Sequence, residues 1–214
     1  MSQGMPVMSP QHRATAQVST TRAAGVILGW LVLMWFLESV DMVVPALGLD
    51  SWGVSPRDVG ELPQIFVAPF IHYGFDHLVA NSVPFLVLGF LIILSGMRPF
   101  ILATLAATLG SGLLVWLASP AGSVTAGASG VIFGWLTFVL ARGFFTRNWV
   151  HLLIGVVVFA VYGGILWGVL PAEEGVSWQG HLGGAVGGLL AARWMAPTRV
   201  RAPQPTTSYP GTPQ

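Results

Sequence analysis

Two residues of this sequence suit covalent chemistry: a serine set between glycines, and a histidine that comes later in the chain. The serine is Ser129, within Gly127-Ala128-Ser129-Gly130, and the histidine is His181. An imidazole can take the proton of a serine hydroxyl and so make the oxygen a nucleophile. Both residues lie in apolar stretches, where an ionisable side chain usually has a function. We therefore expect Ser129 and His181 to meet as nucleophile and general base.

The composition is that of a membrane protein. Of the 214 residues, 54% are hydrophobic and 8% are charged, and the mean hydropathy is +0.73. A soluble domain carries about 25% charged residues, so we expect membrane lipid to surround this chain. The absence of cysteine excludes disulfides and thiolate metal sites. A net charge of +1 offers no basic surface for nucleic acid, and we expect no nucleic-acid partner.

Six apolar segments approach the roughly 20 residues that a helix needs to cross a bilayer. These segments are 23–46, 76–95, 100–117, 129–141, 149–170 and 180–195. The polar residues 1–22 and 196–214 are predicted to be disordered tails. The first apolar segment lacks a clear small-x-small cleavage site, which favours a retained span over a signal peptide. The sequence thus predicts one membrane domain over 23–195, with a structured interfacial loop over 47–73.

The arginines indicate how the chain is oriented. There are nine arginines and no lysines, a bias typical of GC-rich bacterial genomes. If six spans alternate, every arginine except Arg57 falls on one side of the membrane, and that side is cytoplasmic by the positive-inside rule. We therefore predict a multi-pass protein of a bacterial cell membrane with both termini in the cytoplasm. Tryptophans near the ends of the spans, such as Trp149 and Trp194, are expected to lie at the interface.

Two of the spans are short enough to begin below the membrane surface. About 13 residues, or about 20 Å of helix, separate Ser129 from Arg142, which we take as the cytoplasmic boundary. His181 lies about 12 residues, or about 18 Å, from Arg193. A hydrocarbon core of about 30 Å then places Ser129 roughly 10 Å below the outer surface, with His181 at a similar depth. Irregular backbone at this depth must line a wet cavity or be enclosed by protein, so we predict a water-accessible pocket.

The second apolar segment brings further polar side chains to the same region. His77 and Asn81 are four residues apart and share one face of a helix, with His72 just before it. Asp76 is expected to cap this helix. His72, His77 and His181 could together hold zinc, but the sequence has no His-Glu-x-x-His pair and no carboxylate deep in a span. We expect no metal and no other cofactor.

The same residues also have purely structural explanations. Glycines such as Gly127 and Gly130 often pack membrane helices, and an isolated serine often makes an interhelical hydrogen bond. Gly184 and Gly188 lie close to the face of His181 and allow a neighbouring helix to approach. We expect that neighbour to be the helix that begins at Ser129. A packing motif without chemistry remains an alternative, and it is compatible with the catalytic interpretation.

Three motifs, taken in order, resemble those of the rhomboid family of intramembrane serine proteases. They are His72-x4-His77-x3-Asn81 on the second apolar segment, Gly127-x-Ser129-Gly130 opening the fourth, and His181-x2-Gly184-x3-Gly188 on the sixth. The match covers roughly residues 47–194, which is the whole membrane core. The resemblance implies an all-α membrane protein, a six-transmembrane-helix rhomboid-like bundle with a buried, shortened fourth helix.

The resemblance also implies a role for each motif residue. Ser129 is expected to be the nucleophile and His181 the general base, in a dyad without a third acid. His77, Asn81 and the backbone N–H of Ser129 are expected to form the oxyanion hole. Phe133 stands where many relatives have a tyrosine that packs on the histidine ring. The remaining residues are expected to support the site: Gly127, Gly130, His72, Gly184 and Gly188.

The activity that the resemblance implies is that of an intramembrane serine endopeptidase. Such an enzyme cleaves transmembrane segments of membrane proteins, typically substrates with one span, near the outer face of the membrane and without a cofactor. The alternative is a catalytically inactive rhomboid-like protein that binds transmembrane clients, although such a protein would usually have lost Ser129 or His181. A transporter is a third alternative, and the spans lack the paired ionisable pathway it would need.

Overall fold

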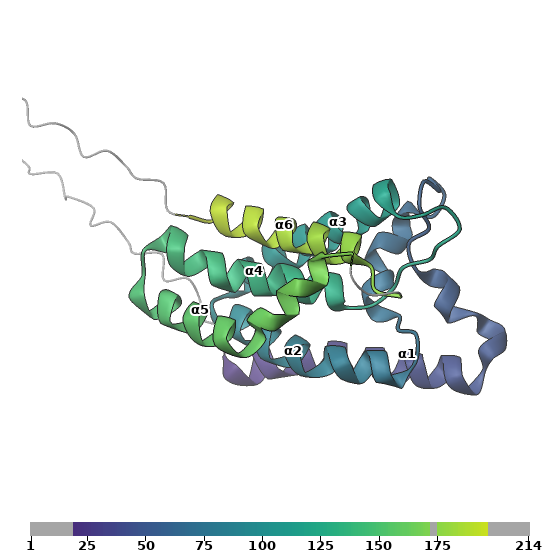
Figure 1. Cartoon of the computed structure of the whole chain (residues 1–214). Coiled ribbons are helices and arrows are strands. Elements are labelled where there is room, and N and C mark those ends of the chain that lie inside the picture. Colours follow the sequence, from purple (N-terminus) through teal and green to yellow (C-terminus); the bar gives the residue numbers. More distant parts are fainter. Residues whose placement is uncertain (1–18, 172–174, 197–214) are drawn as a thin grey trace, which may run out of the picture.

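The computed structural model describes residues 19–171 and 175–196, and these residues are mainly helical (Figure 1). The α-helices are α1 (Thr20–Val43), α2 (Phe75–Leu94), α3 (Met97–Ala118), α4 (Ser129–Thr146), α5 (Trp149–Tyr162) and α6 (Trp178–Trp194). Short 3-10 helices connect or extend them: η1 (Pro45–Leu47), η2 (Leu49–Trp52), η3 (Leu62–Phe66), η4 (Ala68–Phe70) and η5 (Gly163–Val169). The start of α1 and the end of α6 lie toward the same end of the bundle (Figure 1).

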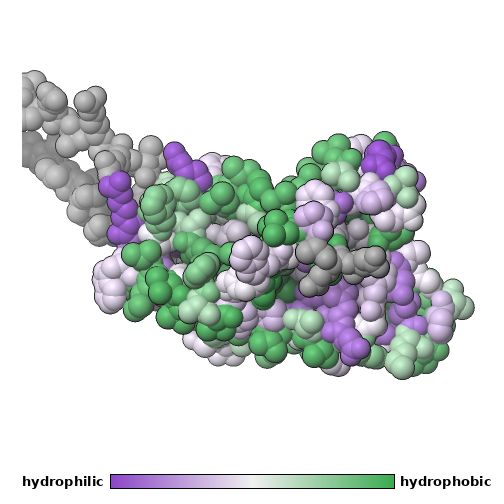
Figure 2. Space-filling view, in the orientation of Figure 1, coloured by the Kyte–Doolittle hydropathy of each residue, from purple (hydrophilic) through white to green (hydrophobic). Residues whose placement is uncertain are grey.

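Five helical segments of the described chain are long and apolar enough to cross a membrane. They are α1, α2, α3, α4, and α5 together with its extension η5. Helix α6 is shorter, with 17 residues. Large apolar side chains are exposed along the outward faces of these helices, α5 above all. Figure 2 shows that hydrophobic residues cover much of the middle of the molecule, whereas strongly hydrophilic ones gather toward its two ends. The chain is therefore a multi-pass membrane protein.

The first two helices begin differently from the prediction. Helix α1 starts at Thr20, after the N-cap Ser19, because the Ser19 hydroxyl accepts a hydrogen bond from the backbone N–H of Arg22. Residues 20–22 of the predicted tail are thus helical, while 1–18 and 197–214 lie outside the described residues. The prediction that Asp76 caps α2 is wrong. The N-cap is Gly74, whose φ of 91° suits glycine, and Asp76 lies in the first turn.

Helix α4 is longer than the sequence indicated. The segment was expected to end at Ala141, but the helix continues to Thr146 and has 18 residues. The helix continues past Arg142, whose guanidinium lies 5.6 Å from the centroid of the Phe138 ring, one turn earlier on the same helix. The helix ends where Arg147 adopts a left-handed conformation, with φ 52°. The depth estimate uses Arg142 as the cytoplasmic boundary of the membrane and not as the end of the helix, so it stays a prediction. At 18 residues, α4 is one residue longer than α6.

An aromatic cluster fixes α4 in the centre of the bundle. Trp135 is fully buried, and its ring centroid lies 4.8 Å from that of Phe85 of α2, 5.6 Å from Phe100 of α3 and 6.0 Å from Trp30 of α1. Its indole N–H donates to the hydroxyl of Thr104 on α3, at 3.0 Å. Losing a buried tryptophan of this kind costs about 3–5 kcal/mol. One side chain thus positions α4 against the three preceding helices.

Helix α6 packs on α3 and α4 at glycine positions, where backbone lies directly against backbone. A Cβ at Gly184 would overlap the carbonyl of Gly130, and one at Gly188 would overlap the carbonyl of Gly134. The close approach predicted between α6 and α4 is thus present. Two more glycines of α6 face the backbone of α3 in the same way: Gly183 and Gly187. Because small residues are required on two faces, the rotation of α6 about its axis is fixed, and with it the direction of His181.

The long connection before α2 supports the segment that leads into α4. Val54 and Thr125 form an isolated antiparallel bridge, with hydrogen bonds of 2.8 and 3.1 Å. The backbone N–H of Gly127 donates to the carbonyl of Ala68 at 2.9 Å. This irregular segment is therefore enclosed and hydrogen-bonded by the structured loop that the sequence predicted, as backbone within a membrane requires.

Candidate active site

Ser129 is the first residue of α4, and a glycine turn precedes it. Gly127 has φ 123°, in the region that favours glycine. A Cβ at Gly127 would also lie 2.7 Å from Cε1 and 2.9 Å from Nε2 of His77. Glycine is thus needed here both for the backbone conformation and for the close approach of the histidine ring. The turn places the Ser129 hydroxyl beside α2 and α6.

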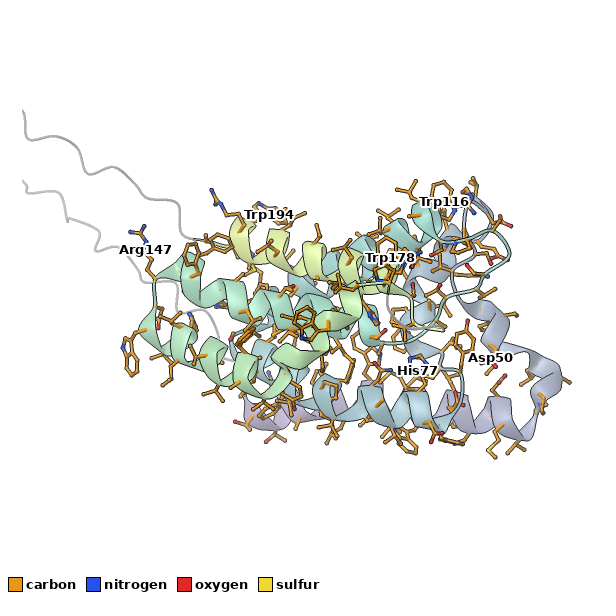
Figure 3. All side chains as sticks on the ribbon, in the orientation of Figure 1. Asp50, His77, Trp116, Arg147, Trp178 and Trp194 are labelled. Carbon is orange, nitrogen blue, oxygen red and sulfur yellow. The ribbon has the colours of Figure 1, made fainter. Side chains whose placement is uncertain are left out.

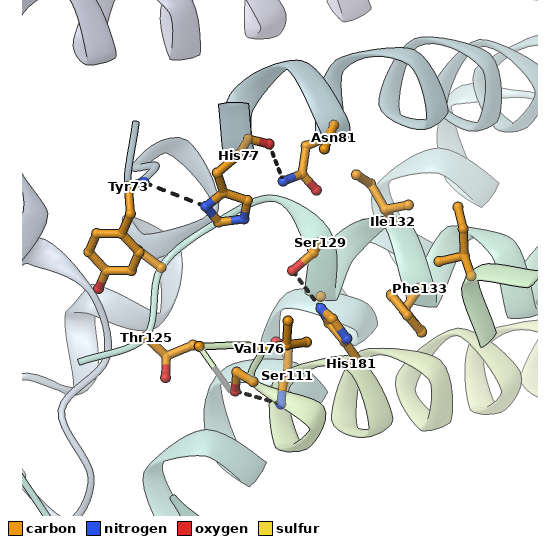
Figure 4. A pocket seen from close by; sticks show the side chains of 18 of the residues that line it. Tyr73, His77, Asn81, Ser111, Thr125, Ser129, Ile132, Phe133, Val176 and His181 are labelled. Atoms are coloured by element: carbon orange, nitrogen blue, oxygen red, sulfur yellow. Dashed lines mark hydrogen bonds between the residues drawn. The ribbon is translucent and has the colours of Figure 1, made fainter. Parts of the chain in front are cut away.

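His181, in the first turn of α6, forms a hydrogen bond with Ser129. Its Nε2 lies 2.9 Å from the Ser129 Oγ (Figure 4), and its Nδ1 lies 2.9 Å from the carbonyl oxygen of Gly168 in η5. A carbonyl only accepts, so the proton belongs on Nδ1, and Nε2 is left to accept from the serine hydroxyl. This is the tautomer that a general base needs. The residue pair predicted from the sequence is brought together.

Gly168 is a part of the site that the sequence did not reveal. Its contribution is a backbone carbonyl, which every residue type has, so no residue pattern could have indicated it. A Cβ at this position would lie 3.0 Å from Cζ of Phe133 and 3.1 Å from Nδ1 of His181. Within the described residues, the partner of the His181 Nδ1 is this backbone carbonyl and not a carboxylate.

Phe133 packs directly on the imidazole of His181. The two ring centroids are 4.0 Å apart and the planes are inclined by 8°. Phe133 lies one turn after Ser129 on the same face of α4, and its side chain is buried. Together with the Gly168 carbonyl, this stack restricts the imidazole to one plane, as the position of Phe133 in the motif predicted.

His77 and Asn81 project from the first turns of α2 toward Ser129 (Figure 4). The Asn81 Nδ2 donates to the backbone carbonyl of His77 at 2.9 Å, which uses one of its two hydrogens. The His77 Nδ1 lies 3.5 Å from the backbone N–H of Tyr73 and accepts from it. With Nδ1 an acceptor, the Nε2 of His77 carries the hydrogen and is a donor. Each side chain therefore has one N–H left for a ligand.

His72 stands behind the nucleophile rather than beside it. Its side chain is buried, and its Nε2 accepts a hydrogen bond from the backbone N–H of Ala128, the N-cap of α4, at 3.3 Å. Burial, with a smaller contribution from the neighbouring His77, lowers the pKa of His72 to about 4, so the ring is neutral. Among the residues described, no group of three His, Cys, Asp or Glu side chains is arranged to hold a metal ion.

Tyr73 joins two segments at the rim of the site. Its hydroxyl donates to the backbone carbonyl of Val124 at 3.0 Å, and its ring stacks on that of His77 at 6.4 Å. Burial, with a smaller contribution from Asp50, raises the pKa of Tyr73 to about 12, so the hydroxyl remains a donor. This residue and Ser111, whose hydroxyl occupies the space that a Cβ at Gly130 would need, were not indicated by the sequence.

A cavity of about 530 Å³ connects these groups. We call it the serine–histidine cavity. The residues that line it come from α2, α3, α4, α6 and the segments before α4 and α6, and they include Ser129, His181, His77, Asn81, Gly127, Gly130, Phe133 and Ser111. Gly184, Gly188 and His72 do not line it. Gly184 and Gly188 instead pack α6 against α4, and His72 accepts the hydrogen bond from the N-cap residue of α4. A cavity of this size can hold several residues of an extended peptide.

Comparison with known proteins identifies one matching family and several similar mycobacterial proteins. A family model described as Rhomboid domain matches residues 59–198. An uncharacterized protein of Mycobacterium tuberculosis is 40% identical over 192 residues, which cover 86% of this chain and 80% of that protein. An uncharacterized protein of Mycobacterium leprae is 42% identical over 174 residues, which cover 78% of this chain and 68% of that protein.

Proposed function

Because the chain belongs to the rhomboid family, we propose that it is an intramembrane serine endopeptidase with Ser129 as nucleophile and His181 as general base. The observation that carries this proposal is the 2.9 Å distance between the Ser129 Oγ and the His181 Nε2 within the serine–histidine cavity. The tautomer favoured by the Gly168 carbonyl supports it further. Phe133 keeps the imidazole in the plane that the reaction needs.

The reaction follows from the positions of the donors and acceptors. The His181 Nε2 takes the proton of Ser129 as its oxygen attacks the carbonyl carbon of the scissile peptide bond. The tetrahedral intermediate collapses, and the imidazolium gives that proton to the leaving amine. Water from the cavity then attacks the acyl-enzyme, again with His181 as the base. The dyad needs no cofactor.

The oxyanion of the tetrahedral intermediate requires hydrogen-bond donors. The Nε2–H of His77, the free N–H of Asn81 and the backbone N–H of Ser129 are suited to this role, because the first two side chains line the cavity and each has an unused hydrogen. Ser129 is the first residue of α4, where backbone N–H groups have no intrahelical acceptor. Loss of one such donor typically slows catalysis by about 10²–10³.

The substrates we propose are transmembrane segments of membrane proteins with a single span. At about 1.5 Å per residue, α4 and α6 are about 27 and 26 Å long, less than the roughly 30 Å of the hydrocarbon core. Their first residues then lie a few ångströms inside the outer surface. A substrate helix that unwinds locally near this face exposes a peptide bond to the cavity, whereas an intact helix shields it.

The topology we propose is a six-span bundle in the cell membrane, with both termini in the cytoplasm. Helix α6 provides the sixth span, and α4 is the shortened one relative to α1, α2 and α3. The membrane domain corresponds to residues 20–195, which adds the first turn of α1 to the predicted 23–195, and the segments 1–19 and 196–214 flank it in the cytoplasm. The distribution of arginines supports this orientation.

Two substitutions test the proposal in membranes of the native host. Ser129→Ala and His181→Ala are expected to abolish cleavage of membrane proteins and labelling by a fluorophosphonate probe. Comparing the membrane proteomes of wild-type and Ser129→Ala cells identifies the uncleaved substrates. Ser123→Ala and His151→Gln are matched controls outside the cavity, and both should leave activity unchanged.

Three results would contradict the protease proposal. One is cleavage that survives Ser129→Ala, and another is inhibition by a chelator that zinc reverses. The third is a wild-type protein that neither cleaves nor reacts with the probe, which would instead favour a rhomboid-like binder of transmembrane clients.

A further inference from the structure

A second large pocket lies at the opposite end of α4 and α6 from the serine–histidine cavity. Its volume is about 770 Å³, and it is formed by the turn between α4 and α5 and the last turn of α6. We call it the arginine pocket. Two arginines, Arg147 and Arg193, line it together with apolar side chains that include Phe144, Trp149 and Leu152. Nothing in the proposed proteolysis uses these residues.

The charge of the arginine pocket is positive. None of the described residues that line it is acidic. The acidic residues in the described part of the chain lie in the second half of α1, in the connection before α2 or in the first turn of α2: Glu38, Asp41, Asp50, Asp58, Glu61 and Asp76. Figure 3 shows Arg147 and Asp50 at opposite ends of the molecule. The described residues thus provide no carboxylate as a counter-ion in the arginine pocket, and its charge attracts an anion.

The two arginines are held in different ways. Arg193 is in the last turn of α6, and its guanidinium lies 6.0 Å from the centroid of the Phe145 ring. Arg147 is the left-handed C-cap of α4, and its side chain is exposed. A guanidinium offers paired N–H donors that match two oxygens of a phosphate. Either arginine can thus bind the oxygens of a phosphate group that enters the arginine pocket.

Exposed aromatic residues adjoin these charges. Phe144 is 75% exposed and Trp149 is 73% exposed. In a chain that spans a membrane, aromatic rings near helix ends lie at the boundary between headgroups and hydrocarbon. Leu152 continues this apolar surface one turn further along α5, and it too is exposed. An anion that fits here has a charged head and an apolar chain.

We propose that the arginine pocket binds an anionic phospholipid, with the phosphate held by Arg147 and Arg193 and the acyl chain lying against Trp149 and Leu152. Basic pockets between transmembrane helices bind such headgroups in general. The proposal requires only that the chain lies in a bilayer, and it does not depend on proteolysis.

The experiment measures lipid binding to the purified full chain in detergent by native mass spectrometry. Phosphatidylglycerol is the probe, and phosphatidylcholine is the neutral comparison. The double variant Arg147→Gln/Arg193→Gln is expected to bind phosphatidylglycerol about 30-fold more weakly than wild type, since each arginine near the surface contributes about five- to sixfold. Arg98→Gln removes an exposed arginine that does not line the pocket, and it should weaken binding by no more than about threefold.

The proposal is overturned if the double variant binds phosphatidylglycerol as wild type does, or if Arg98→Gln weakens binding equally. It is also overturned if inorganic phosphate at millimolar concentration displaces the lipid completely, because the site would then be one for a free anion. If the double variant is less stable than wild type in detergent without added lipid, binding of phosphatidylglycerol to the single variant Arg147→Gln is compared with wild type instead. A loss of about fivefold supports the lipid site, and unchanged binding contradicts it.

Discussion

At the scale of single residues, Ser129 and His181 lie within hydrogen-bond distance because a glycine turn and a helix N-terminus place them there. The imidazole is oriented by the carbonyl of Gly168 and by the ring of Phe133, not by a carboxylate. A neutral acceptor contributes about 0.5–1.5 kcal/mol, against about 1.5–3 kcal/mol for a charged one. The orientation of His181 is therefore weakly held and should respond to small changes in η5.

Two glycines of the same 3-10 helix test this dependence. The Cβ of Gly168→Ala would press on Phe133 and His181, whereas a Cβ at Gly164 meets nothing within 4 Å. Displacement of a base by a fraction of an ångström is costly, so we expect Gly168→Ala to slow fluorophosphonate labelling of Ser129 by about tenfold. Gly164→Ala should label within about twofold of the wild-type rate. Equal rates for all three proteins would show that Gly168 does not position the base.

The lowered pKa of His72 predicts that the stability of the protein depends on pH. Its pKa is about 4 in the folded chain, against a usual value of 6.5. Between these values the unfolded chain binds a proton that the folded chain does not, so the free energy of unfolding falls as the pH falls from 6.5 toward 4. The full shift corresponds to about 3 kcal/mol at most. His72→Gln does not titrate, and its side-chain oxygen can accept from Ala128.

Unfolding in detergent at about pH 7 and about pH 4.5 measures the effect. Wild type should lose up to about 2.5 kcal/mol more than His72→Gln over this interval, somewhat less than the full shift. His77, whose ring centroid is 5.0 Å from that of His72, is present in both proteins. The difference between them therefore isolates His72. If both proteins lose the same stability, His72 does not have the lowered pKa.

At the scale of helices, α6 is held by contacts between backbones. Its glycines lie against the carbonyl groups of α3 and α4, so the helix has almost no tolerance for added volume. The consequence for the site is direct, because Gly184 is one turn from His181 and contacts Gly130, which follows Ser129. The same contact that packs the two helices sets the distance between the two catalytic candidates.

Substitution of the packing glycines tests this coupling. Gly184→Ala and Gly188→Ala should each destabilise the protein by about 2–3 kcal/mol, because overpacking against backbone cannot relax through a side-chain rotation. Gly184→Ala should also reduce labelling of Ser129. Gly29→Ala in α1 is the matched control, since its Cβ meets nothing within 4 Å, and alanine there should be neutral or stabilising by up to about 1 kcal/mol. Titration with SDS measures the free energy of unfolding of the three variants and of wild type. If Gly184→Ala and Gly188→Ala are as stable as Gly29→Ala, the packing argument is wrong.

At the scale of the whole molecule, charge divides the protein into two ends. Acidic residues lie near the end that holds the serine–histidine cavity, and most arginines of the described chain lie at the other end. Arg57 is the exception, and its guanidinium donates to the backbone carbonyl of Ser119 at 2.9 Å, so it is used to anchor a loop. This asymmetry is what supports the proposed orientation.

Labelling of introduced cysteines tests the orientation, because the chain has no cysteine of its own. Ser51→Cys places an exposed thiol in η2, near the cavity end, and Ser95→Cys places one at the end of α2. A membrane-impermeant maleimide should label Ser51→Cys in spheroplasts and Ser95→Cys only after lysis. The unsubstituted chain is the blank. The reverse pattern would place both termini outside.

The amino-acid sequence by itself determined the membrane setting, the approximate spans and the residues able to react. Hydropathy and the spacing of glycines are properties of short stretches of sequence, so they can be recognised without knowing which segments pack together in the fold. Even the packing of Gly184 and Gly188 on α4 was predictable, because small residues on one helix face indicate a close partner.

Tertiary structure alone decided the features that depend on contacts between distant segments. Helix α4 extends past Arg142, whose guanidinium lies against the ring of Phe138 and is partly buried. The partner of the His181 Nδ1 is a backbone carbonyl that η5 brings back across the bundle. Every residue carries such a carbonyl, and only folding selects the one that orients the imidazole.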